Sequence, residues 1–156
     1  MIRKATIKDV KRIQKLVKFY AKRDEMLPRS LNELYENIRD FFIFEQNGKV
    51  AGCCALHICW EDLGEIKSLA VVKSKHGRGI GKKLLTACLE DAARLKLKKI
   101  FALTYKPAYF KKFGFKEIDK ANLPHKIWID CIKCVKFPDC DEIALIKELP
   151  SSKGGT

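Results

Sequence analysis

The sequence predicts a single domain of the α/β (α+β) class, in which strands and helices alternate along the chain. At 156 residues with 47% hydrophobic content, the chain can bury a sizeable core without disulfides or metal ions. Apolar residues recur at helical spacing in some stretches and form short runs in others. The pair Asn47-Gly48, between two such runs, is the strongest short signal for a β-hairpin.

The first half of the chain is expected to contain one strand, two helices and three further strands. Strands are expected over residues 2–7, 42–45, 50–60 and 63–72. The first helix carries apolar residues at helical spacing: Val10, Ile13, Leu16, Val17 and Tyr20. The second helix is expected to begin at the capping box Ser30-Leu31-Asn32-Glu33. Its predicted apolar side consists of Leu34, Tyr35, Ile38 and Phe41.

The second half is expected to alternate in the same way. Helices are predicted over residues 81–95 and 107–113, and Gly114 ends the shorter one. Strands are predicted over residues 100–104, 126–131 and 143–149. The polar, glycine-rich tail over residues 150–156 is expected to be disordered, which leaves residues 1–149 as the domain.

A strand that continues through a basic, glycine-rich turn into a helix is the most informative feature of the chain. The strand is Glu65-Ile66-Lys67-Ser68-Leu69-Ala70-Val71-Val72, and the turn leads through Gly79-Ile80-Gly81 into the helix predicted over residues 81–95. Such a turn leaves backbone N–H groups unpaired at a helix N-terminus, where they and the helix dipole favour phosphate. Gly79 and Gly81 lack the Cβ that would keep a pyrophosphate from the backbone.

Two better-known phosphate loops do not fit this stretch. A Walker loop requires Gly, and then Ser or Thr, at positions that His76 and Lys83 occupy. A dinucleotide-binding fingerprint requires a third Gly where Lys82 or Leu84 stands. The sequence therefore leaves two interpretations, a different phosphate loop or a loop that only turns the chain into a helix.

Two motifs make the chain resemble the GNAT acetyltransferases. The segment His76-Gly77-Arg78-Gly79-Ile80-Gly81 resembles the acyl-CoA loop of that family, with His76 where the family has Arg or Gln. A second family hallmark is Ala108-Tyr109-Phe110-Lys111-Lys112-Phe113-Gly114-Phe115. The order of predicted elements is similar to the GNAT fold over about residues 1–149. The resemblance implies a single-domain GNAT fold with a mixed, mostly antiparallel central sheet flanked by helices.

The resemblance also implies acetyl-CoA as co-substrate. The backbone from Leu69 to Val71 would pair with the pantetheine arm, and the N–H group of Leu69 would polarise the thioester carbonyl. The pyrophosphate would lie on the backbone of the glycine loop. The implied cofactor-binding residues are Leu69, Ala70, Val71, His76, Gly77, Arg78, Gly79, Ile80, Gly81, Lys82 and Lys83.

Direct acetyl transfer to an amine is helped by a base, because an amine with a pKa of about 10 is charged at pH 7. By resemblance Glu65 is that base; the alternative is a solvated residue at the start of a strand. Strand alternation places Lys67 and Leu69 on the same face as Glu65. Many family members carry a tyrosine acid where this chain has Phe110. Tyr109 or solvent would then protonate the thiolate, unless Tyr109 is only a packing aromatic.

Three local segments resemble the amino-acid acetyltransferases that make N-acetylglutamate for arginine synthesis, in the short form without a kinase-like domain. They are Leu27-Pro28-Arg29-Ser30, the run from Gly52 to Ile66, and Phe101-Ala102-Leu103-Thr104. In that branch an arginine matching Arg29 binds a substrate carboxylate, for which a planar fork is suited. Arg29 could instead steady its loop. Lys106 and Lys126 are candidates for a second carboxylate, so L-glutamate is the expected acceptor.

Two other functions stay open. A peptide or protein N-acetyltransferase would need an open acceptor groove, and a hairpin over residues 126–149 that closed the groove would count against it. A non-catalytic acyl-CoA-binding sensor would keep the loop without turnover. Phe110 allows such a sensor, whereas Glu65 argues against it.

The seven cysteines are odd in number and unevenly spaced, which argues for reduced thiols. Four lie in apolar runs and are interpreted as core residues rather than nucleophiles: Cys53, Cys54, Cys59 and Cys88. Three others stand close together in the sequence with a histidine nearby: Cys131, Cys134, Cys140 and His125. This set could bind zinc, but the second close pair of a firm zinc signature is missing, so no metal is assigned.

The formal net charge of +13 suggests nucleic acid as a partner to be considered. Lysine outnumbers arginine, is spread along the sequence and lacks the planar fork, so we interpret the charge as a solvated face with a local share that attracts coenzyme A. Beyond the small-molecule amino acid, neither nucleic acid nor a membrane is expected as partner. The apolar run over residues 50–60 is too short to span a membrane and the N-terminus has no apolar h-region, which predicts a cytoplasmic location. The oligomeric state stays open, a homodimer included.

Overall fold

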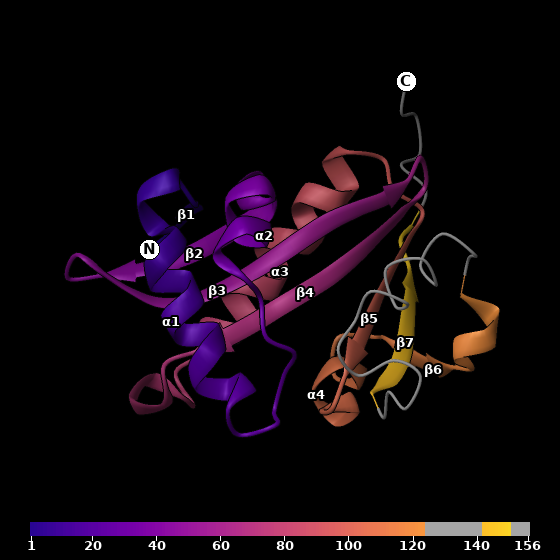
Figure 1. Ribbon diagram of the computed structural model, residues 1–156. Coiled ribbons are helices and arrows are strands. Elements are labelled where there is room, and N and C mark those ends of the chain that lie inside the picture. The colour runs from indigo at the N-terminus through magenta and orange to yellow at the C-terminus, as the bar shows by residue number, and fades with distance from the viewer. Residues whose placement is uncertain (124–141, 151–156) are drawn as a thin grey trace.

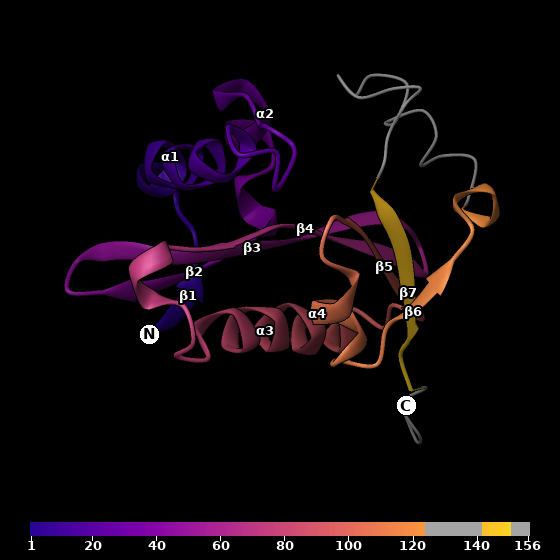
Figure 2. The same cartoon turned by 90° about the horizontal axis from the view of Figure 1, so that it is seen from below.

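The computed structural model describes residues 1–123 and 142–150. The predicted strand over residues 126–131, Lys126, the zinc candidates and the tail over residues 151–156 lie outside the described residues. The described chain forms one seven-stranded sheet with helices on both faces (Figure 1, Figure 2). The predicted α/β (α+β) class is confirmed.

The elements follow one another in nearly the predicted order. The strands are β1 (Ile2–Lys4), β2 (Phe41–Gln46), β3 (Lys49–Trp60), β4 (Leu63–Val71), β5 (Lys99–Thr104), β6 (Lys116–Ile118) and β7 (Ile143–Glu148). The α-helices are α1 (Val10–Ala21), α2 (Leu31–Glu36), α3 (Ile80–Arg94) and α4 (Pro107–Lys111). The sheet order is β1-β2-β3-β4-β5-β7-β6. Strands β4 and β5 run parallel, and the other neighbours are antiparallel.

An apolar core lies on each face of the sheet. Helices α1 and α2 cover one face and α3 covers the other (Figure 2). The first helix buries all of its predicted apolar residues: Val10, Ile13, Leu16, Val17 and Tyr20. On the other face, Leu84 and Leu85 of α3 pack against Leu56 and Ile66 of the sheet. The helical spacing therefore predicted correctly which side of α1 faces the core.

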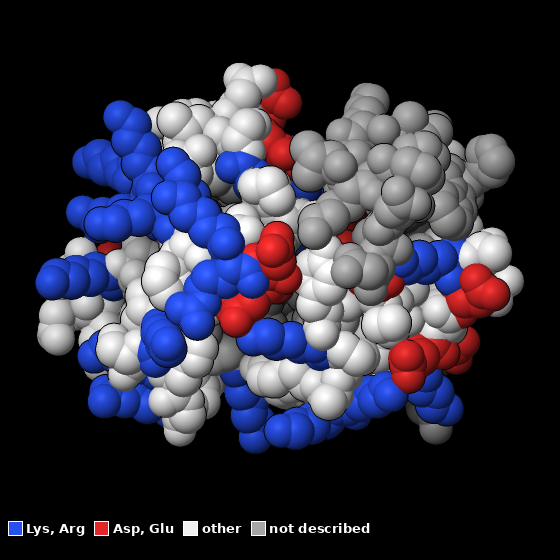
Figure 3. All heavy atoms as spheres, turned by 60° about the horizontal axis from the view of Figure 1, so that its bottom comes forward, with Lys and Arg blue, Asp and Glu red and all other residues white. Residues whose placement is uncertain are grey.

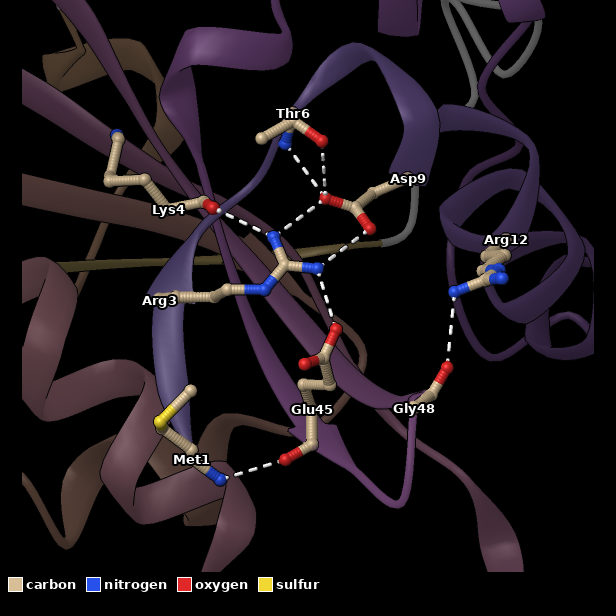
Figure 4. Close-up of polar contacts among 8 residues, drawn as sticks. All are labelled: Met1, Arg3, Lys4, Thr6, Asp9, Arg12, Glu45 and Gly48. Carbon is tan, nitrogen blue, oxygen red and sulfur yellow. Dashed lines mark hydrogen bonds and ion pairs between the residues drawn. The ribbon is translucent and has the colours of Figure 1, made fainter.

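The first strand is shorter than predicted, because a buried ion pair turns the chain after it. Asp9 is 2% exposed and accepts hydrogen bonds from Arg3 Nη1 at 2.9 Å, Arg3 Nη2 at 3.0 Å and the Thr6 N–H group at 2.7 Å (Figure 4). Arg3 also contacts Glu45 of β2 at 2.8 Å. Burial would raise the pKa of Asp9, but the hydrogen bonds from Arg3 and Thr6 hold that pKa below its usual value. The segment after β1 is therefore a 3-10 turn.

Helix α2 is also shorter than predicted. Its start is capped as expected, since Ser30 Oγ accepts from the Glu33 N–H group at 3.1 Å. Asn37 then leaves the helical conformation, and its side-chain amide donates to the carbonyl of Glu33 at 2.8 Å. Phe41 consequently begins β2 instead of lying on the apolar side of a helix.

Strand β6 was not predicted. It has three residues and pairs with β7 at the edge of the sheet. Three residues are too few for alternation to show in a sequence. The predicted last strand is confirmed as β7.

A β-bulge interrupts β4. Two of its residues, Ser68 and Leu69, lie opposite one residue of β3, and Ser68 has a φ of +54°. The alternation is reversed beyond the bulge, so Leu69 packs in the same core as Ile66, on the face away from Glu65 and Lys67. The prediction that Glu65, Lys67 and Leu69 share one face is therefore wrong for Leu69.

Strands β4 and β5 pair only at their beginnings. Their parallel register runs from Leu63↔Lys99 to Ile66↔Ala102. The strands then spread apart in Figure 1, with α4 at the far end of β5. Among the described residues, the edge of β4 after Ile66 has no strand beside it on this side, and its backbone groups face the opening.

Candidate active site

A cavity of about 580 Å³ opens where β4 and β5 diverge. Its walls come from β4, the glycine loop with the start of α3, the β5–α4 connection and the loop between α1 and α2. This volume is typical of small-molecule and cofactor sites. Most of the predicted site residues line it: Arg29, Glu65, Leu69, Ala70, Val71, His76, Gly77, Gly79, Ile80, Gly81, Lys82, Lys106 and Tyr109.

Two predicted cofactor-binding residues do not line this cavity. Arg78 is exposed on the glycine loop. Lys83 lies on another side of α3, with its ammonium 5.7 Å from the centre of the Phe44 ring. The other residues of the loop, from His76 to Lys82, line the cavity.

His76 has a defined role in the structure. Its Nε2 lies 2.9 Å from the carbonyl oxygen of Val71 and 2.8 Å from the hydroxyl of Tyr20. The Tyr20 hydroxyl donates to the same carbonyl. With a hydrogen on Nε2, His76 would donate to that carbonyl, because a carbonyl oxygen only accepts.

Three glycines of the loop are required for different reasons. Gly77 and Gly79 have φ values of +79° and +76°, in the left-handed region that favours glycine. A Cβ on either would meet no atom within 4 Å, so the space beside them is open. A Cβ on Gly81 would lie 2.6 Å from the hydroxyl oxygen of Tyr109. A larger residue at position 81 would therefore have to displace the Tyr109 hydroxyl.

Glu65 lies in the wall of the cavity with an exposed fraction of 9%. Lys67 Nζ is 3.8 Å from Glu65 Oε1, and the Lys67 side chain is 21% exposed. The interpretation of Glu65 as a solvated residue is therefore wrong. A carboxylate in the wall of a cavity is placed to accept a proton from an amine bound there.

Tyr109 and Phe110 both face the cavity from α4. The Tyr109 ring contacts those of Phe110 and Phe113, with centroids 5.8 and 5.3 Å away. Burial raises the pKa of Tyr109, so its hydroxyl keeps its proton at neutral pH. The two interpretations of Tyr109, proton donor and packing aromatic, are both compatible with this position.

Arg29 reaches the cavity from the loop between α1 and α2. Its Nη1 donates to Glu33 Oε2 at 3.1 Å, and its Nε donates to Ser68 Oγ at 3.4 Å. The side chain is 20% exposed. Lys106 lines the cavity at the start of α4, and Lys126 lies outside the described residues. The structure thus brings Arg29, Lys106 and Glu65 into one cavity.

Several lining residues were missed as site residues: Tyr20, Lys67, Ser68 and Glu142. Lys67 had a signal, because alternation puts it beside Glu65. Tyr20 was recognised as a core residue of α1, and helical spacing does not reveal that its hydroxyl ends at Val71. Ser68 and Glu142 carried no signal, since a bulge and a distant loop depend on tertiary structure.

Basic side chains gather on the exposed side of α1, at the left of Figure 3. The exposed residues there are Lys11, Arg12, Lys15, Lys18, Lys22 and Arg23. The contact of Tyr20 with His76 places the end of α1 against the glycine loop. Part of the net charge therefore lies on α1, whose last turn contacts this loop, and there it favours approach of a polyanion such as coenzyme A.

The four described cysteines are core residues, as predicted: Cys53, Cys54, Cys59 and Cys88 are buried. Burial raises the pKa of Cys53 to about 12. A hydrogen bond with Cys88, together with burial, raises the pKa of Cys54 well above its usual value. These two thiols are therefore poor nucleophiles, which supports direct transfer over a covalent route.

The described residues contain no group of three His, Cys, Asp or Glu side chains that could hold a metal ion. The zinc candidates Cys131, Cys134, Cys140 and His125 lie outside those residues. No helix in the described part of the chain is both long enough and apolar enough to cross a membrane.

Sequence comparisons agree with this architecture. The model of the acetyltransferase (GNAT) family matches residues 7–115. An uncharacterized N-acetyltransferase of Chlorobaculum tepidum is 39% identical over 148 residues, which cover 95% of this chain and 96% of that protein. An amino-acid acetyltransferase of Mycobacterium tuberculosis is 39% identical over 122 residues, covering 76% of this chain and 70% of that protein.

Two solved structures share the fold over 96% of this chain. A Mycobacterium tuberculosis protein in complex with CoA has a TM-score of 0.83 at 31% identity, with 99% of that chain covered. N-acetylglutamate synthase from Neisseria gonorrhoeae, complexed with coenzyme A and N-acetyl-glutamate, has a TM-score of 0.88 at 28% identity, with 35% of that chain covered. Because the family match includes the glycine loop and α4, and because these relatives share the fold, the chain belongs to the GNAT acetyltransferase family and is an acetyl-CoA-dependent N-acetyltransferase.

Proposed function

We propose that the chain transfers the acetyl group of acetyl-CoA directly to the α-amino group of an amino acid, with L-glutamate as the first candidate. The observation that carries this proposal is the cavity in which Arg29 and Lys67 lie on the same side as the buried Glu65. The carboxylate of an amino acid can bind the cations Arg29 and Lys67, and its amine can give a proton to Glu65. The relatives named amino-acid acetyltransferase support this choice.

The donor side would use the open edge of β4 and the glycine loop. Acetyl-CoA supplies an activated acetyl thioester. The N–H group of Leu69 would donate to the thioester oxygen and stabilise the negative charge that develops there. The backbone N–H groups at the start of α3, beyond Gly79, would donate to the pyrophosphate. His76 would hold the end of β4 in place through the carbonyl of Val71.

The chemistry at the amine would be a proton transfer coupled to bond formation. Glu65 would take the proton of the ammonium, directly or through water, so that the nitrogen lone pair can form the new C–N bond. The attacking nitrogen then loses a second proton to water while the C–S bond breaks, and the thiolate takes a proton from Tyr109 or from solvent. Lys67 Nζ, 3.8 Å from Glu65 Oε1, would hold that carboxylate in place in the wall of the cavity.

The acceptor would be held by its carboxylates. Arg29 is proposed to bind one of them through the part of its guanidinium that does not contact Glu33 or Ser68. Lys67 and Lys106 line the same cavity and are candidates for the second, together with Lys126. A role in arginine biosynthesis in the cytoplasm follows if glutamate is the acceptor.

A screen of the 20 amino acids as acceptors with acetyl-CoA, read out by thiol release, tests the proposal. Glutamate should give the highest kcat/KM, and Glu65→Gln should remove most of the signal while coenzyme A still binds. Preference for the N-terminus of a peptide would favour the peptide acetyltransferase. Binding of coenzyme A without turnover of any acceptor would favour the sensor.

A further inference from the structure

Ser68 has a backbone conformation that strands rarely contain. Its φ of +54° lies in the left-handed region, in the middle of β4 and at the bulge. A residue other than glycine is uncommon there, and such conformations persist where surrounding contacts stabilise them, often at functional sites. We therefore expect contacts that stabilise this conformation of Ser68 and a function that depends on it.

A contact from the neighbouring strand β3 holds the backbone of Ser68. The thiol of Cys53, which is fully buried in β3, donates to the Ser68 carbonyl at 3.3 Å. The carbonyl is thus directed toward Cys53 in the core between the sheet and α1, while Ser68 also lines the cavity. The bulge is a packed feature of the donor strand rather than a loose segment.

The hydroxyl of Ser68 contacts the acceptor side. Arg29 Nε donates to Ser68 Oγ at 3.4 Å, and Arg29 Nη1 donates to Glu33 at 3.1 Å. The two contacts hold the guanidinium from two sides and, among the described residues, leave its Nη2 hydrogens for a bound carboxylate. Ser68 is also the residue before Leu69, whose N–H group is proposed to polarise the thioester.

We propose that Ser68 is a positioning residue that sets the distance between the acceptor and the donor. Its hydroxyl fixes Arg29 relative to β4, so a carboxylate on Arg29 holds the amine at one place between Glu65 and the thioester carbon. Acceptors with a free carboxylate are thereby selected. The proposal rests on the proposed function, because it takes Arg29 as the carboxylate contact.

Two substitutions separate the hydroxyl from the backbone. Ser68→Ala removes the hydroxyl and keeps the strained conformation, whereas Ser68→Gly removes the hydroxyl and relieves the strain. Both should raise the KM for the acceptor by about threefold to tenfold, the value of one hydrogen bond. The KM for acetyl-CoA and the rise in melting temperature caused by coenzyme A should stay at wild-type values in the glycine variant. An unchanged acceptor KM in both variants would overturn the proposal.

A double-mutant cycle distinguishes positioning from a general loss of structure. In the Arg29→Ala background, Ser68→Ala should change the acceptor KM by less than about twofold, because the group that Ser68 positions is already absent. The same increase with and without Arg29 would overturn the proposal.

The acceptor in these measurements is the best free amino acid found with the wild type. The proposed function is tested with the wild-type protein alone, and it is rejected if that protein acetylates no amino acid. In that case the role of Ser68 fails with it. If the wild type acetylates an amino acid and the Ser68 variants have the same acceptor KM as the wild type, the positioning role is rejected and the proposed function is retained.

Discussion

Replacing Gly81 by alanine should destabilise the chain, although alanine is the better helix former. Gly81 is the second residue of α3, so its backbone is already helical. The new Cβ would lie 2.6 Å from the Tyr109 hydroxyl oxygen. To admit the new Cβ, Tyr109 would have to shift its ring against those of Phe110 and Phe113, whose centroids lie 5.8 and 5.3 Å away.

The size of the effect follows from two opposing contributions. Overpacking of a tight contact costs about 1–3 kcal/mol, whereas replacing glycine by alanine in a helix returns up to about 1 kcal/mol. The net loss in the free energy of unfolding is about 1 kcal/mol. For a chain of this length that corresponds to a fall in Tm of about 2–4 °C.

The matched background is Tyr109→Phe, which removes the atom that clashes. The next atom of the ring, Cζ, lies 3.6 Å from the position of the new Cβ, an ordinary contact. In that background Gly81→Ala should raise Tm instead of lowering it. Thermal unfolding of the wild type, the two single variants and the double variant measures the sign change. An equal change in Tm with and without the Tyr109 hydroxyl would refute this explanation of Gly81.

Three further predictions concern the donor, the base and the acceptor. Gly79→Val should abolish the rise in Tm caused by coenzyme A, because φ at this position is +76° and the side chain would face the phosphate. Gly48→Val, at a φ of +71° in the β2–β3 hairpin, is the matched control and should keep the shift. Glu65→Gln should lower kcat by roughly 10²–10⁴-fold. The loss should be smaller at high pH, where the amine loses its proton without a base. A wild-type kcat of this variant at pH 7 would exclude Glu65 as the base. Arg29→Ala should raise the KM for glutamate by about 30-fold or more, since loss of a charge partner costs about 2–5 kcal/mol and 1.4 kcal/mol is about tenfold. Arg29→Lys should recover part of that loss, and a KM equal to that of the wild type would exclude Arg29 as the carboxylate contact.

The parts of the site that could be predicted from the sequence are those fixed by local backbone chemistry. Gly77 and Gly79 need left-handed φ values, and this need appears directly as glycine in the sequence. The apolar side of α1 could be predicted for a similar reason, because helical spacing is a local pattern. The donor loop and the helices around it were therefore predictable.

The acceptor side depends on contacts between segments far apart in the sequence. Ser68 lies 39 residues from Arg29 in the sequence. No local pattern predicts that a bulge will direct the Ser68 hydroxyl toward Arg29. The bulge also reverses the alternation of β4, which is why the predicted face of Leu69 was wrong. A one-residue shift of register changes the face of every following side chain, and a single sequence does not encode it visibly.

The segment between α1 and α2 bears on the choice between an amino acid and a peptide as acceptor. It is attached to β4 at both ends, by Tyr20 at the carbonyl of Val71 and by Arg29 at Ser68. Between these contacts, Met26 and Leu27 line the cavity. A peptide acceptor needs an open groove, whereas this segment is held against the donor strand on the acceptor side. The hairpin that the sequence suggested as a closing element lies largely outside the described residues, so the support for a small acceptor comes from this attached segment instead.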